Sequence, residues 1–226
     1  MRIVSIDVGI RNFAMCIAHG DPEGTQCILG FYKYDLLNQQ VPVTRGMPEI
    51  DGLLRILERH KDDLMSADVI LVERQPPGGI LSVQAVLYAT FSGKVKLMSP
   101  NSMHKHFKMT DMDYEERKTE VDRIVSQDLW PKVSREAQKA YMKSTRRHDM
   151  ADAACFAIQF LTAWHARRSR KNLFFRFSFD PGPRTSSETH NPHTSQTSSW
   201  VHPPIASEVD NTQSATTCTS DIETSP

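Results

Sequence analysis

Apolar and polar positions alternate in two different rhythms along the first 165 residues. Runs rich in β-branched and aliphatic residues at 3–8, 13–19 and 26–34, with a turn at 21–24, predict a meander of three strands. Two further apolar runs, at 68–73 and 94–98, flank a helical pattern at 80–91. A strand–helix–strand order predicts a right-handed crossover and parallel pairing. The chain is therefore expected to be an α/β protein with a mixed five-stranded sheet flanked by helices.

The remaining patterns are helical or irregular. One amphipathic helix is predicted near 49–65, a polar helical insertion at 101–141, and an Ala-rich helix from His148 to about His165. A basic cluster and an aromatic run follow, after which the periodicity ends. Residues 180–226 contain 18 Ser or Thr and few apolar residues, a composition typical of disorder. We therefore expect one domain over 1–179 and a disordered tail over 180–226.

The composition of the sequence indicates which kinds of partner and which cellular location are expected. The 226 residues have a formal net charge of zero, but six acidic residues and one basic residue fall in 180–226, which leaves the preceding domain moderately basic. A basic surface suits a polyanionic partner without requiring one. No apolar run reaches the roughly 20 residues of a membrane span, and the N-terminus lacks a signal-peptide pattern, so an intracellular, non-membrane protein is expected. The four scattered cysteines predict neither a zinc site nor a disulfide framework.

Four acidic residues occupy positions that are expected to be buried, where an ionised carboxylate costs free energy. Asp7 interrupts the first β-branched run, Glu73 ends another apolar strand, and Asp149 and Asp152 share one face of the last helix at spacing i, i+3. If the two acidic strands are neighbours, the four carboxylates can converge, and a hard divalent cation such as Mg²⁺ is the natural counter-charge. A capping role for Asp7, or a favourable helix dipole for Asp149 and Asp152, would explain each feature separately but not all four together.

Three short motifs in this order resemble the RuvC-type Holliday junction resolvases of the ribonuclease H-like superfamily. They are Ile6-Asp-Val-Gly-Ile-Arg-Asn12, Val72-Glu-Arg-Gln75 and His148-Asp-Met-Ala-Asp-Ala153, and the resemblance covers about residues 1–165. It is greatest to the viral (poxvirus and iridovirus-like) and fungal mitochondrial branch.

The resemblance implies a ribonuclease H-like nuclease domain over 1–179. It also implies a homodimer that binds branched, four-way DNA and nicks two strands symmetrically, with two Mg²⁺ ions that Mn²⁺ can replace and no small-molecule cofactor. The catalytic residues and metal ligands would be Asp7, Glu73, Asp149 and Asp152. A viral member would act in the cytoplasm or nucleus of its host.

Basic and amide side chains near these motifs are candidate DNA contacts, which would position the phosphate backbone rather than read sequence. They are Arg11, Asn12, Arg74, Gln75, Lys105, Lys108, Lys143, Arg146 and Arg147. A simple surface turn is an equally good interpretation of Arg11 and Asn12.

Three alternative functions compete with junction resolution. A ribonuclease H-like nuclease acting on flaps, hybrids or other branched substrates would use the same acids, with substrate choice in 101–145. A junction-binding protein without turnover would gain nothing from four clustered acids. A sugar-kinase or actin-like ATPase shares the strand–Asp-x-Gly opening, but it needs a duplicated domain and Gly-rich phosphate loops that this sequence lacks.

Overall fold

The computed structural model describes residues 1–39 and 47–178, with side chains described as far as 169. Five strands form one mixed sheet in the order β3-β2-β1-β4-β5. The strands are β1 (Arg2–Asp7), β2 (Phe13–Gly20), β3 (Gln26–Tyr34), β4 (Val69–Glu73) and β5 (Val95–Met98). β1, β2 and β3 pair antiparallel as a meander, and β4 is parallel to both β1 and β5. The predicted five-stranded mixed sheet is confirmed, while the predicted tail at 180–226 and its boundary lie outside the described residues.

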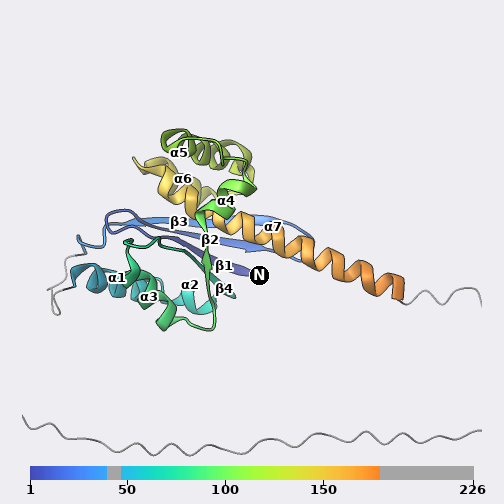
Figure 1. Ribbon diagram of the computed structural model, residues 1–226, viewed down its shortest axis with the longest axis horizontal. Helices are drawn as coiled ribbons and strands as arrows, with labels where there is room; N and C mark the ends of the chain where they lie inside the picture. The colour runs from blue at the N-terminus through green and yellow to red at the C-terminus, as the bar shows by residue number, and fades with distance from the viewer. Residues whose placement is uncertain (40–46, 179–226) are drawn as a thin grey trace, which may run out of the picture. The chain divides into compact units, whose positions relative to one another are not determined.

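Helices cover both faces of the sheet, with α1–α3 on one face and α4–α7 on the other (Figure 1). The first group is α1 (Pro48–Arg59), α2 (Lys61–Ser66) and α3 (Leu81–Thr90). The second is α4 (Pro100–His106), α5 (Tyr114–Arg123), the π-helical η1 (Ile124–Asp128), the 3₁₀ turn η2 (Trp130–Lys132), α6 (Arg135–Lys143) and α7 (Arg147–Ser178). Among the described helices, none is long and apolar enough to cross a lipid bilayer.

Side-chain alternation divides the core into two layers, one on each face of the sheet. Val4 and Ile6 of β1 face α1, where they pack with Leu53. Ile3 of β1 and Leu71 of β4 face the opposite way, into the layer that contains α7. Every second residue of β1 and β4 therefore points toward α7, and this parity decides where the acidic side chains lie.

Small side chains let α7 lie close against the middle of the sheet. Ala14, Cys16 and Ala18 of β2 are fully buried in the layer that α7 joins, as are Ala154 and Ala157 of α7. Short side chains on both surfaces reduce the distance between helix and strand while the interface stays packed. The first turns of α7 are thereby brought against the sheet.

The structure corrects two predicted helix boundaries. The helix predicted over 49–65 is two helices, because His60 leaves helical geometry and is buried with its Nε2 2.6 Å from the Tyr34 hydroxyl. The last helix continues beyond His165 to Ser178. Residues 166–178 contain neither Gly nor Pro, so no helix-breaking residue interrupts it.

Candidate active site

Two acids meet at the ends of adjacent parallel strands. β1 and β4 pair with Ile6 opposite Val72, which puts Asp7 and Glu73 at the same level, one residue farther along. By the alternation of the strands, both side chains point toward α7. The two side chains line the same cavity. The predicted convergence of the two acidic strands is therefore confirmed.

The third acid comes from α7. Asp152 and Phe156 lie one turn apart on this helix and share a cavity of about 230 Å³ with Asp7 and Glu73. The other lining residues come from the α4–α5 segment: Pro100, Met103, His104, Tyr114, Arg117 and Lys118. The cavity thus has an acidic floor on the sheet and α7, and a wall that carries two cations.

Two of the acids, Asp7 and Asp152, have a raised pKa. Burial raises the pKa of Asp7 well above its usual range, and the nearby charges of Asp152, Glu73 and Asp149 raise it further. Burial, followed by the charges of Glu73 and Asp149, raises the pKa of Asp152 to about 7, while Arg117 and Lys118 act in the opposite direction. The site therefore favours added positive charge.

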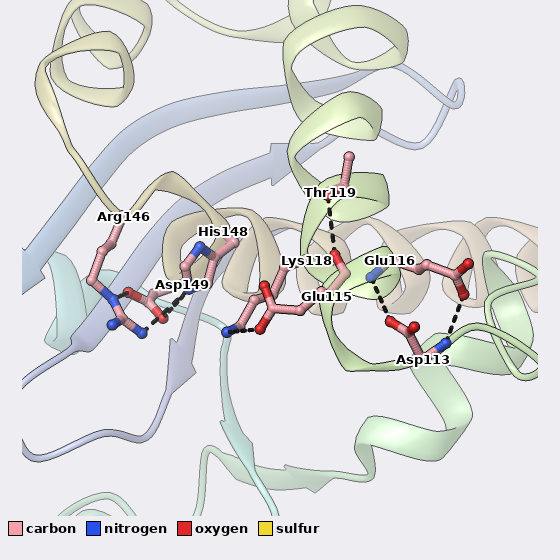
Figure 2. Close-up of polar contacts among 8 residues, drawn as sticks. All are labelled: Asp113, Glu115, Glu116, Lys118, Thr119, Arg146, His148 and Asp149. Carbon is pink, nitrogen blue, oxygen red and sulfur yellow. Dashed lines mark hydrogen bonds and ion pairs between the residues drawn. The ribbon is translucent and has the colours of Figure 1, made fainter.

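Asp149 lies beside the cavity and is already paired. Its Oδ2 accepts a hydrogen bond from Arg146 Nε at 3.3 Å, and its Oδ1 lies 3.3 Å from His148 Nε2 (Figure 2). Asp149 is buried, with 7% of its surface exposed. It contributes to the electrostatics of the cavity, but its carboxylate faces these two side chains.

The four candidate ligands are all carboxylates, and their negative charges repel one another. This set of oxygen donors therefore suits a hard divalent cation. Within the described residues, however, no three His, Cys, Asp or Glu side chains are arranged as a ready metal-binding group. Asp149 is directed toward Arg146 and His148. Asp7, Glu73 and Asp152 would hold the cation, and Asp149 would need to leave its partners to join them.

The cationic wall was missed by the sequence analysis. Lys118 Nζ lies 3.2 Å from Glu115 Oε1 and 3.6 Å from the centre of the Tyr114 ring, and hydrogen bonding to Tyr114 and then to Glu115 raises the pKa of Lys118. Figure 2 shows Lys118 on the same helix as the capping pair Asp113 and Glu116. That Asp-x-x-Glu capping box, whose two reciprocal hydrogen bonds measure 2.8 and 2.9 Å, is the sequence signal that could have located the start of α5.

The candidate DNA contacts fall into two groups. Exposed side chains are those of Arg11, Arg74, Lys105, Lys108, Lys143 and Arg146, although Arg146 is paired with Asp149 and Arg11 lies 3.8 Å from Asp35. Partly buried ones are Asn12, Gln75 and Arg147, of which Gln75 and Arg147 hydrogen-bond within the protein. DNA contact by any of the nine stays a prediction.

A partly buried polar network fixes the start of α7. Asp122 of α5 accepts a hydrogen bond from the Tyr141 hydroxyl at 2.6 Å and another from Arg147 Nη2 at 3.0 Å. Tyr141 is fully buried, and burial together with the Asp122 contact raises its pKa. Three helices are thereby joined two residues before Asp149.

Tyr141→Phe is expected to lower the free energy of unfolding by about 1–3 kcal/mol, because Asp122 loses its Tyr141 partner inside the protein. Urea denaturation of both proteins measures the difference. Tyr88→Phe, at a tyrosine that is 51% exposed, is the matched control and should change little. Equal stability of the Tyr141→Phe variant and the wild type would contradict a structural role for this hydroxyl.

Comparison with solved structures identifies the fold. The structure of the yeast mitochondrial Holliday junction resolvase Ydc2 matches with a TM-score of 0.59 and 20% identity, over 79% of this chain and 86% of that one. The fowlpox virus Holliday junction resolvase matches with a TM-score of 0.55 and 18% identity, over 72% of this chain and 99% of that one. This chain shares its fold with these two Holliday junction resolvases.

The same fowlpox resolvase fold is also solved with its substrate, Holliday junction DNA, and that structure matches with a TM-score of 0.55, 18% identity and coverage of 73% and 99%. No protein-family model and no curated protein matches this chain by sequence. The likeness to these resolvase structures supports the fold that the resemblance of the three acidic motifs predicted.

Proposed function

We propose that this protein is a divalent-metal-dependent endonuclease that resolves four-way DNA junctions. The observation that carries the proposal is the cavity in which Asp7, Glu73 and Asp152 face Arg117 and Lys118, within a resolvase fold. Three clustered carboxylates, two of which (Asp7 and Asp152) have a raised pKa, suit a cation, and two nearby basic side chains suit a phosphodiester. Mg²⁺ is the proposed ion, with Mn²⁺ as a substitute.

Each group has a separate role in the proposed hydrolysis. Asp7, Glu73 and Asp152 would hold the metal, while Arg117 and Lys118 attract the scissile phosphate and offset its charge. The bound cations would supply Lewis acidity toward the phosphodiester. Water adds to phosphorus, the P–O3′ bond breaks, and the products are a 5′-phosphate and a 3′-hydroxyl.

Cleavage assays on synthetic DNA test this function. A labelled four-way junction, a linear duplex, a flap and an RNA–DNA hybrid are incubated with the protein with and without Mg²⁺. Paired, metal-dependent nicks on the junction alone are the expected result. Preferential cutting of the hybrid or the flap would assign a different substrate to the same site, and tight junction binding without any cutting would favour a scaffold protein.

The proposed paired nicks need two active sites, so the full-length chain is expected to be a homodimer at micromolar concentration. Sedimentation velocity over a concentration series measures its mass against the 25.7 kDa of one chain. A strict monomer that still nicks both strands in one binding event would contradict this expectation.

A further inference from the structure

Gln75 makes a direct contact with one of the three acids in the cavity. Its side-chain Nε2 donates a hydrogen bond to Glu73 Oε2 at 2.8 Å. The backbone N–H of Val8 donates to the same oxygen at 3.4 Å. Glu73 is therefore held by one donor from the loop that follows β4 and by a second donor next to Asp7.

The other end of the Gln75 amide is also occupied. Its Oε1 accepts a hydrogen bond from the backbone N–H of Ile80 at 3.1 Å, immediately before α3. An ionised carboxylate only accepts and a backbone N–H only donates, so a single orientation of the amide satisfies both partners. Gln75 is thus a bridge between Glu73 and the N-terminus of α3.

The surrounding loop fixes this bridge in place. The backbone N–H of Gln75 donates to Gln84 Oε1 on α3 at 2.8 Å. At Gly79, an added Cβ would lie only 2.9 Å from Gln75 Oε1 and 3.0 Å from the carbonyl oxygen of Pro76. The Gln75 side chain therefore occupies space that only a glycine at position 79 leaves free.

We propose that Gln75 is a positioning residue that orients Glu73 for metal binding and couples this acid to the conformation of loop 74–80. This proposal rests on the function proposed above and assigns Gln75 a role different from DNA contact. A partner in the second coordination sphere that orients a ligating carboxylate typically affects metal affinity or activity by about 10–100-fold. DNA that contacts the exposed Arg74, Pro76 or Pro77 would act on Glu73 through the same bridge.

Gln75→Met tests the bridge while nearly preserving side-chain size. The expected result is a fall of about 10–100-fold in the single-turnover rate of junction cleavage, a rise of about tenfold in the Mn²⁺ concentration for half-maximal binding, and a junction Kd in Ca²⁺ within about twofold of the wild type. Gln127→Met, at an exposed glutamine, is the matched control. A loss of junction affinity that accounts for the whole loss of rate would overturn the proposal in favour of direct DNA contact, as would an unchanged rate.

Gly79→Ala tests the same bridge from its other side. The added methyl group should displace the Gln75 amide and slow cleavage about tenfold in the wild-type background but cause little further loss in Gln75→Met, because both changes remove one interaction. Gly93→Ala, where no atom lies within 4 Å of the added Cβ, is the control. Fully additive effects of Gly79→Ala and Gln75→Met would contradict the coupling.

A measurement on the protein alone separates this inference from the proposed function. If the wild type cuts no nucleic acid, the proposed function fails, but NMR of the Glu73 side-chain carboxyl carbon and calorimetric titration with Mn²⁺ still test the bridge. Gln75→Met should shift that resonance and weaken Mn²⁺ binding. An unchanged resonance together with unchanged binding would overturn the role of Gln75 whatever the substrate.

Discussion

Asp7→Asn is expected to slow junction cleavage by about a thousand-fold while leaving the protein folded and able to bind the junction. The substitution keeps the size of the side chain but removes a negative charge from the centre of the acidic cavity. Metal binding depends on that charge, whereas the proposed DNA contacts lie on other side chains. Single-turnover cleavage in Mg²⁺ and junction binding in Ca²⁺ measure the two effects separately.

Thermal denaturation provides the structural control for Asp7→Asn. Burial and three neighbouring acids raise the pKa of Asp7, so its ionised form destabilises the folded protein near neutral pH. The Tm of the metal-free variant should therefore equal or exceed that of the metal-free wild type, as is common for active-site acids. Asp111→Asn, at an exposed aspartate, should change neither property. Full activity of Asp7→Asn, or its failure to fold, would contradict the role assigned to this carboxylate.

Gly52→Ala is expected to destabilise the protein by about 3 kcal/mol or more. Gly52 lies in the middle of α1 and is buried, and an added Cβ would overlap the backbone carbonyl of Leu36. Because the obstructing atoms belong to the backbone, relief requires α1 to move away from the segment after β3. Leu53 and Ile56, both fully buried on this helix, would lose packing against the sheet.

Chemical denaturation of Gly52→Ala measures this loss, and Gly93→Ala serves as the matched control. Gly93 has no atom within 4 Å of an added Cβ, so its substitution tests the chemical change without the clash. A Gly52→Ala variant as stable as the wild type would show that α1 can shift without cost.

The sequence predicted most of the sheet and the three acids of the cavity because both depend on local pattern. β-Branched runs specify strands. A carboxylate at the end of such a run stands out in the sequence because burying its charge costs free energy. The break at His60 was missed, and the contact that His60 makes there is with Tyr34, which lies 26 positions earlier in the chain. No periodicity could have indicated that contact.

The cavity wall was missed for a different reason. Arg117 and Lys118 belong to a polar segment in which charged side chains of both signs are interspersed, so no single one stands out. Their importance comes from where α5 lies relative to Asp152, and that placement depends on the packing of Val121 and Tyr141 against α7. The hydrogen bond from Gln75 to Glu73 was also not predicted, and the same Gln75 side chain accepts a second bond from the Ile80 N–H, five positions along the chain.

The parity of β1 and β4 limits how this protein can evolve. Asp7 and Glu73 face α7 because each is an even number of residues from a core position, Ile3 and Leu71 respectively, on the same face. A single-residue insertion or deletion within either strand would send its acid to the α1–α3 face and exchange the two core layers at the same time. Length changes are thus excluded from these strands and confined to the connections between them, so divergence in these two strands should proceed by substitution alone.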